Sequence, residues 1–186
     1  TYKARLPPRP LPSISARPHI RTRRLVIRPF LPSDLEAFYA LRRVHETQAH
    51  STSRGRAVRD LEEARNSLAG LQAPHDEHHW YFGAFLASTG ELVGEGGLAD
   101  IRHQPVSGWP RCEMLISPAF WRQGYGTEFF DALLNSWWDL PRERRKHQLL
   151  PFCIGDQQEP GREVIERLEL IWEADNVAAC NFFPKA

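Results

Sequence analysis

The chain has 186 residues, of which 41% are hydrophobic and 25% are charged, which is typical of one globular domain with a single core. Lys and Arg number 24 against 23 Asp and Glu, and a net charge of +1 gives no overall field that would favour nucleic acid or an anionic membrane. No apolar run approaches a membrane span, and Cys112, Cys153 and Cys180 match neither a disulfide framework nor a paired-cysteine metal site, so we expect a cytoplasmic protein without metal.

The chain is predicted to begin with a proline-rich arm. Five prolines fall within residues 1–19 and disfavour a helix there. We expect the arm to be disordered or to lie extended on the surface, and the string RLPPRPLP leaves open a role as a ligand for an SH3-type module. The folded domain is expected over residues 20–186.

A strand and two helices are predicted next. The β-rich run at residues 25–27 stops at Pro29. Ser33, followed by Glu36 three residues later, matches a capping box and predicts a helix that begins there. Helical spacing of apolar residues predicts a second helix over residues 58–70, with a glycine at its end.

A hairpin, a third strand and a long helix follow. Two β-rich runs, residues 80–86 and 92–98, flank a short turn that contains glycine. A further β-rich run at residues 112–117 predicts the next strand. The most strongly periodic helix in the sequence begins near Gly124 and ends at Pro141.

The last third of the chain is predicted to return to the sheet. Residues 141–163 are charged and weakly periodic, so we expect a functional flap or a mobile connection. Alternation over residues 165–173 predicts a strand, which a right-handed crossover would place parallel to residues 112–117. A final helix is predicted to begin at Asn176.

Two glycines at the start of the long helix indicate a phosphate site. Without a Cβ at Gly124 and Gly126, a bulky anion can lie against the free N–H groups of the first helical turn, with Arg122 beside it. No Walker string is present, and a dinucleotide fingerprint would need a glycine where the chain has Phe129. A glycine-containing helix entry with no ligand is the alternative.

Four segments together resemble the GCN5-related N-acetyltransferase (GNAT) family. The string EMLISPAFWRQGYGTEFF resembles its motif A, which binds the pyrophosphate of acetyl-CoA, and EADNVAACNFF resembles its motif B. The strings RTRRLVIRPFLPSDLEAFYAL and ELVGEGGL resemble the opening strand and helix and the third strand. The pattern of a proline, a tryptophan and then GYGTE is similar to the pattern in the branch of the family that includes the ribosomal-protein N-terminal acetyltransferases.

The resemblance implies a mixed α/β fold with a mostly antiparallel sheet flanked by helices. Parallel fourth and fifth strands would splay apart and take acetyl-CoA between them. It further implies that the pantetheine arm pairs with the fourth strand, that the turn before the long helix holds the pyrophosphate, and that motif B contacts the pantetheine or the substrate. The implied residues are Met114, Leu115, Ile116, Arg122, Gln123, Gly124, Tyr125, Gly126, Thr127 and Asn176.

The implied reaction is direct attack of a primary amine on acetyl-CoA, with strand N–H groups facing the developing oxyanion. The acceptor would be an amine-bearing small molecule or a protein N-terminus, and we expect no nucleic-acid or membrane partner. Glu113 and Glu173 are candidate general bases, although exposed carboxylates at strand edges are common without any such role. His75, His78 and His79 match no zinc spacing and read as an exposed loop or a substrate rim.

The sequence departs from the family at its end. Phe183 stands where many members have a general-acid tyrosine, and Ala186 falls before the family's last two strands. The expectation is that this strand pair is missing or that a second chain supplies it in a homodimer. These departures keep open a non-catalytic, acetyl-CoA-binding regulatory or scaffold domain, and a longer acyl-CoA remains a further alternative.

Overall fold

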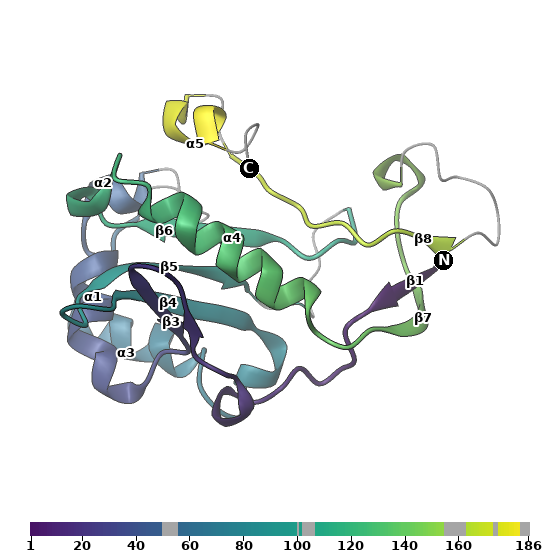
Figure 1. The fold of residues 1–186 in the computed structure, drawn as a ribbon, viewed down its shortest axis with the longest axis horizontal. Coiled ribbons are helices and arrows are strands. Elements are labelled where there is room, and N and C mark those ends of the chain that lie inside the picture. Colours follow the sequence, from purple (N-terminus) through teal and green to yellow (C-terminus); the bar gives the residue numbers. More distant parts are fainter. Residues whose placement is uncertain (50–55, 100, 102–106, 155–162, 173–174, 183–186) are drawn as a thin grey trace.

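The centre of the fold is a five-stranded antiparallel sheet (Figure 1). A computed structural model describes residues 1–49, 56–99, 101, 107–154, 163–172 and 175–182. The strand order is β2-β3-β4-β5-β6. The strands are β2 (Ile20–Arg21), β3 (Leu25–Arg28), β4 (Trp80–Leu86), β5 (Leu92–Leu98) and β6 (Cys112–Ile116), so the predicted hairpin and third strand are confirmed.

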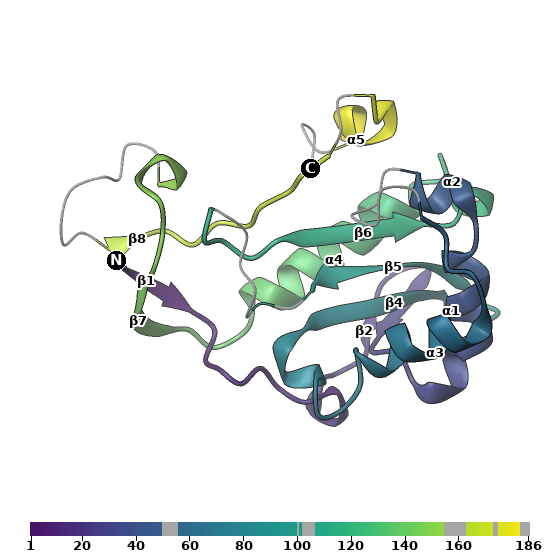
Figure 2. The same ribbon diagram turned by 180° about the vertical axis from the view of Figure 1, so that it is seen from behind.

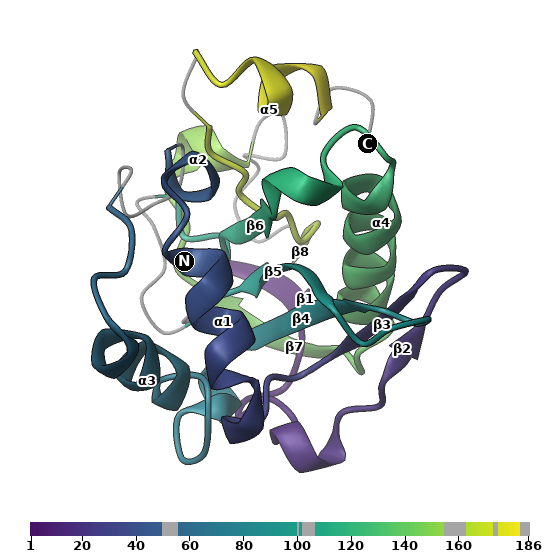
Figure 3. The ribbon, with the colours of Figure 1, turned by 90° about the vertical axis from the view of Figure 1, so that its left-hand side faces the viewer.

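Helices cover both faces of this sheet (Figure 3). Helix α4 (Tyr125–Trp138) lies on one face, and α1 (Leu35–Arg42) and α3 (Leu61–Ala69) lie on the other. Short helices α2 (His45–Gln48) and α5 (Val177–Phe182) complete the set, together with single 3₁₀ turns at Ile14–Ala16, Pro32–Asp34, Asp76–His78, Pro118–Phe120 and Pro151–Cys153. No helix in the described ranges is long and apolar enough to cross a membrane.

Strand β4 is apolar on both sides because both of its faces are buried. Trp80 and Phe82 pack in the core under α4, whereas Tyr81 and Phe85 pack under α1 and α3. Side chains alternate between the two faces of a strand, so one continuous hydrophobic run serves both cores. Helix α4 presents the expected stripe to its side of the sheet, in which Phe129 is fully buried.

The start of the proline-rich arm joins a second sheet (Figure 2). Strand β1 (Tyr2–Leu6) pairs antiparallel with β7 (Glu143–His147) and parallel with β8 (Glu163–Val164). The strand ends before the first proline, and its backbone groups are paired as a strand requires. Residues 143–147 were expected to lie in a functional flap or a mobile connection. They form a strand because β1 supplies hydrogen-bond partners, which a local charge pattern cannot reveal.

The predicted strand over residues 165–173 does not form in the part that is described, 165–172. A single parallel bridge joins Arg111 and Glu169, with Glu169 N donating to Pro110 O at 2.8 Å and Cys112 N donating to Glu169 O at 2.9 Å. The expected parallel direction is therefore present at one position only. Ile165 and Ile171 are 71% and 61% exposed, so the alternating pattern marks a segment that covers the core from one side.

The first helix begins differently from the prediction. Residues Pro32–Asp34 form a 3₁₀ turn, and helix α1 begins after it, with Asp34 in place of Ser33 as the flanking residue. The Asp34 carboxylate accepts a hydrogen bond from Leu31 N at 2.7 Å and pairs with Arg28. The predicted serine cap is therefore absent, and the Asp34 carboxylate stabilises the 3₁₀ turn before the helix instead of capping α1 itself.

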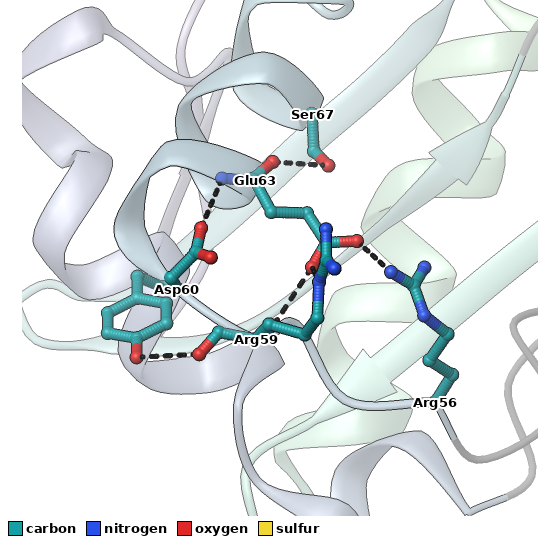
Figure 4. Close-up of polar contacts among 6 residues, drawn as sticks. Arg56, Arg59, Asp60, Glu63 and Ser67 are labelled. Carbon is teal, nitrogen blue, oxygen red and sulfur yellow. Dashed lines mark hydrogen bonds and ion pairs between the residues drawn. The ribbon is translucent and has the colours of Figure 1, made fainter.

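Helix α3 has a well-formed N-terminus (Figure 4). The Asp60 carboxylate accepts from Glu63 N at 2.8 Å, which is the usual N-cap bond. The Glu63 carboxylate accepts from Arg59 N at 2.9 Å and pairs with Arg56, and Ser67 donates to the Glu63 carbonyl. These hydrogen bonds and the ion pair define the start of the helix more firmly than its few apolar residues alone would.

Glu128 joins helix α4 to the turn between β2 and β3. Its carboxylate accepts from Thr22 Oγ1 at 2.6 Å, from Arg24 N at 2.8 Å and from Arg24 Nε at 2.7 Å. Partial burial raises the pKa of Glu128, but the hydrogen bonds from Thr22 and Arg24 outweigh it, so the pKa lies below its ordinary value.

We expect Gly97→Ala to destabilise the fold far more than Gly90→Ala. Both glycines have a positive φ, 143° and 77°, which strains any other residue. A Cβ at position 97 would also overlap the Trp80 carbonyl oxygen and lie 2.7 Å from the Tyr81 Cα, whereas position 90 is open. The additional loss should be about 1–3 kcal/mol in urea unfolding. Equal losses in the two variants would contradict the packing described for β4 and β5.

We expect Glu128→Gln to lower the free energy of unfolding at pH 7 by about 1–3 kcal/mol, because charge-assisted bonds become neutral ones. Since the folded pKa is lowered, this stabilisation is complete above the unfolded pKa of about 4.3 and is lost as the pH falls through the folded value. The difference between wild type and variant should therefore shrink between pH 7 and pH 3. Glu91→Gln, at an exposed turn, is the control. A pH-independent difference for position 128 would show that its charge is not responsible.

Candidate functional site

A cleft of about 550 Å³ opens beside the outer edge of β6. Its walls come from β6, the turn before α4, the 170–172 segment, helix α5 and the α1–α2 region. The lining residues are Arg42, Glu46, Thr47, Gln48, Tyr81, Arg111, Cys112, Glu113, Met114, Leu115, Ile116, Phe120, Trp121, Arg122, Gly124, Gly126, Thr127, Leu170, Ile171, Trp172, Asn176, Ala178, Ala179, Asn181 and Phe182. Most of the residues that motif reasoning selected therefore meet in one place.

The backbone of β6 faces the cleft at Met114. Cys112 N donates away from β5, to Glu169 O. Along an antiparallel strand the outward-pointing groups recur at every second residue, so the N–H and C=O of Met114 and Ile116 point the same way. The Ile116 carbonyl accepts from Trp121 Nε1 at 2.7 Å. The edge is thus occupied near its two ends, and Met114 presents its main-chain groups between them.

The turn before α4 has the backbone shape of an anion cradle. Gly124, which precedes the helix, has φ of 81°, and Arg122 is left-handed with φ of 62°. The first-turn N–H groups of a helix have no partners within the helix and carry its positive dipole end. Arg122, Gly126 and Thr127 line the same part of the cleft. A Cβ on Gly126 would lie 3.7 Å from Met114 Cε, so this glycine faces β6 across a narrow gap.

Gln123 and Tyr125 lie in the predicted phosphate turn but do not line the cleft. The Gln123 side chain donates to the Ala119 carbonyl at 2.9 Å. The Tyr125 ring packs edge-on against Phe120, with ring centroids 5.6 Å apart. Their side chains stabilise the turn on the side away from the cleft, so a ligand in the cleft would meet their backbone N–H groups and not their side chains.

The turn before α4 is also held by Arg24, a residue of the β2–β3 turn that sequence reasoning missed. Its guanidinium donates to the Gln123 carbonyl at 2.9 Å, lies 4.1 Å from the centre of the Tyr125 ring and pairs with Glu128 at 2.7 Å. One side chain from the β2–β3 turn thereby contacts Gln123 and two positions of the GYGTE segment, Tyr125 and Glu128. It sits in a run of arginines, RTRR, whose members the sequence alone does not distinguish.

Asn176 both caps helix α5 and lines the cleft. Its Oδ1 accepts from Ala179 N at 3.0 Å and so caps helix α5. The residue lines the cleft beside Phe182, whose ring packs on Phe130 of helix α4. This hydrogen bond fixes the orientation of the Asn176 side chain, which the family resemblance implies as a contact of the pantetheine or the substrate.

The far end of the cleft holds a buried polar network. Glu95 is fully buried, and its Oε1 accepts from Arg42 Nε at 2.8 Å. The Arg42 guanidinium lies close to the Tyr81 hydroxyl. Burial, and then the Glu95 charge, raise the pKa of Tyr81 well above its ordinary value, so the phenol stays protonated. Within the described part of the chain, Glu95 Oε2 and the hydroxyl of Thr47 have no partner.

Glu113 belongs to this end of the cleft. The sheet register places Tyr81, Gly97 and Glu113 in one row across β4, β5 and β6. Side chains of paired residues share a face, so Tyr81 and Glu113 flank a position without a side chain. Burial, and then the Glu113 charge, raise the pKa of the Cys112 thiol to about 12, which makes it a poor nucleophile. Glu173 lies outside the described residues.

The arrangement divides the cleft into three regions. A helix N-terminus and Arg122 favour an anionic group at one end, and an open strand edge favours an extended amide chain in the middle. A carboxylate and a protonated phenol favour an amine at the other end. His75, His78 and His79 do not line the cleft, and no three metal-binding side chains come together within the described ranges.

A family model described as an acetyltransferase (GNAT) domain matches residues 24–186. A search of curated proteins found no match. Among solved structures, a GNAT-family acetyltransferase from Bacillus anthracis is 20% identical, with 63% of this chain and 64% of that chain covered and a TM-score of 0.51. The chain thus spans slightly less than two thirds of that protein.

Two further structures cover more of the chain. A candidate ribosomal-protein-serine acetyltransferase from Vibrio cholerae is 20% identical over 90% of this chain and 80% of that chain, with a TM-score of 0.59. The ribosomal α-N-protein acetyltransferase RimL, in complex with coenzyme A, is 16% identical over 90% and 82%, with a TM-score of 0.62. At these identities the likeness shows a shared fold. With the family model spanning most of its length, the chain belongs to the GNAT acetyltransferase family.

Proposed function

We propose that this protein transfers the acetyl group of acetyl-CoA to a primary amine by direct attack. The observation that carries the proposal is the cleft itself, in which a glycine-opened helix start, the open edge of β6 at Met114 and the polar end around Glu113 follow one another. Each region suits one part of the reaction. Acetyl-CoA would supply the activated acetyl thioester.

The residues fit such a co-substrate. Backbone N–H groups from Arg122 to Thr127 would hold the pyrophosphate, with the Arg122 guanidinium adding charge. The main chain of Met114 to Ile116 would pair with the amides of the pantetheine arm, as an added strand does. Asn176 and Phe182 would close the opposite wall. The gap at Gly126 is shaped by the absence of a side chain, as close approach of a phosphate requires.

Proton transfer would take place at the polar end. The attacking amine must be neutral, and Glu113 would accept its proton directly or through one water. The Tyr81 phenol, protonated at neutral pH, would donate a hydrogen bond to the acceptor from a buried position near Arg42 and Glu95. Glu173 stays a second candidate base. With Phe183 at the family's tyrosine position, water would return the proton to the leaving thiolate.

The acceptor would be a small amine or a protein N-terminus. Two relatives of the same fold are described as ribosomal-protein acetyltransferases, which supports a protein N-terminus in a cytoplasmic setting. A non-catalytic acetyl-CoA-binding domain is the competing function, and it is favoured by the phenylalanine at position 183. Mixing the protein with acetyl-CoA and a panel of amines and N-terminal peptides, and measuring free thiol, separates the two. Thiol release with acetylated acceptor supports the enzyme, whereas acetyl-CoA binding without release supports the regulatory domain.

Gly126→Val should weaken acetyl-CoA binding at least about tenfold, because a branched side chain would fill the gap between α4 and β6. Calorimetric titration with acetyl-CoA measures the effect. Asn135→Val places the same residue at an exposed position of the same helix and should leave affinity unchanged. Thermal unfolding confirms that both variants are folded. Wild-type affinity in Gly126→Val would place the cofactor elsewhere.

Glu113→Gln should lower kcat by about 10²–10⁴ while acetyl-CoA affinity changes little, because the amide cannot accept the proton of the amine. Glu173→Gln tests the second candidate in the same assay, and Glu91→Gln is the matched control. The limb of the pH–rate profile that belongs to the base should disappear in the variant that removes it. Near-normal turnover in both variants would leave solvent as the proton acceptor.

A further inference from the structure

The outward face of the small sheet carries four cations in two opposed pairs. In the β1–β7 register, Lys3 lies opposite Lys146, and Arg5 lies opposite Arg144. All four residues are exposed. The other face of β1 is buried through Ala4, which lies in a separate apolar cluster. We call the four cations the basic face, and the sheet that bears it lies at one end of the molecule (Figures 1 and 2).

Positive charge is concentrated in β1, β7 and the residues next to them. Residues 1–9 and 142–147 contain seven of the 24 Lys and Arg residues but one of the 23 acidic residues. These two segments therefore carry +6, and the rest of the chain carries −5. The near-neutral total, which gives no overall field, conceals a local positive field.

Internal pairing does not explain the basic face. Like charges directly opposite each other destabilise a sheet. Glu163 of β8 neutralises part of the charge, since its carboxylate lies 3.0 Å from Arg5 Nε and 2.7 Å from Arg144 Nε. Lys3 and Lys146 form no ion pair with any described residue. Among the described residues, Glu163 pairs with the two arginines and leaves the two lysines of the basic face outside ion-pair distance, although Lys3 is its register partner.

Protection of a sheet edge does not explain it either. Charged side chains on an edge strand discourage unwanted strand pairing, and this accounts for β7. Lys3 and Arg5, however, belong to β1, which is the central strand of the order β7-β1-β8. Their charges do not protect an edge.

We propose that the basic face binds an acidic segment of another polypeptide in an extended conformation. Glu163 supplies the internal precedent, because a carboxylate from a neighbouring extended strand already fits between two of the arginines. Alternate residues of a strand lie about 7 Å apart on one face. Lys3 and Lys146 lie two residues along their strands from Arg5 and Arg144, so a carboxylate of the bound segment would reach the two lysines beside the position that Glu163 already occupies.

The same face is a poor match for single-stranded nucleic acid, which needs aromatic side chains for base stacking. Tyr2 and His147, the aromatic residues of this strand pair, lie on the opposite face, where His147 packs on Trp109. A duplex needs only charge, so it forms the competing arm of the test.

The test is fluorescence anisotropy with a labelled peptide of alternating Glu and Ser. Wild-type protein should bind it, and affinity should fall as salt rises, because the contacts are exposed charges. The double variant Lys3→Ser, Lys146→Ser should bind roughly tenfold more weakly. Arg21→Ser with Arg23→Ser removes two exposed charges from another surface and should have little effect. Thermal unfolding confirms that both double variants are folded.

Three results would overturn the proposal: no peptide binding by the wild type, equal weakening in the two double variants, or tighter binding of a DNA or RNA duplex of the same total charge. The last would assign the basic face to nucleic acid. Acetyl transfer is not measured, so a failure here is distinct from a failure of the proposed activity.

Discussion

The outer edge of β6 is the constraint on which the rest of the site depends. A strand edge normally must be paired, covered or charged. Here the edge is occupied at Cys112 by Glu169 and at Ile116 by the indole of Trp121, and the groups of Met114 lie between them. The parallel bridge at Glu169 fixes one wall of the cleft to the sheet. From that point the two segments stand on opposite sides of a cleft that can accept an extended ligand.

Two charged side chains connect the sheet to the two ends of this cleft. Arg24 links the β2–β3 turn to the start of α4, so that the proposed phosphate turn is held by an element from the far edge of the sheet. Arg42 links α1 to Glu95 of β5 at the other end. Removing Arg42 would leave a fully buried carboxylate without its counter-charge, a change that typically costs several kcal/mol. The site is therefore rigid at both ends, as precise placement of two reactants requires.

Local patterns were sufficient wherever an element packs against the core along its whole length. Strands β4 and β5 and helix α4 follow their hydrophobic periods, and the GYGTE segment with Asn176 identified the cleft through family resemblance. The pattern failed where a partner distant in sequence decides the structure. Strand β7 exists because β1 pairs with it, and residues 165–172 alternate in polarity while making only one bridge. Arg24 and Arg42 had no sequence signal, since burial and geometry alone distinguish them from the other arginines.

The small sheet and the cleft are connected by one short segment. Strand β8 ends at Val164 beside β1, and Leu170, which lines the cleft, follows six positions later, with five residues between the two. An extended chain covers at most about 3.3–3.6 Å per residue, which limits the distance between Val164 and Leu170 to about 20 Å.

A protein acceptor of modest length could therefore place its N-terminus near Glu113 while an acidic segment rests on the basic face. Linked contacts of this kind raise the effective concentration of the amine at the cleft without any change in the chemistry there. A small amine could use only the cleft. The two proposals together thus favour a protein acceptor, whose binding would depend on salt more steeply than that of a small amine.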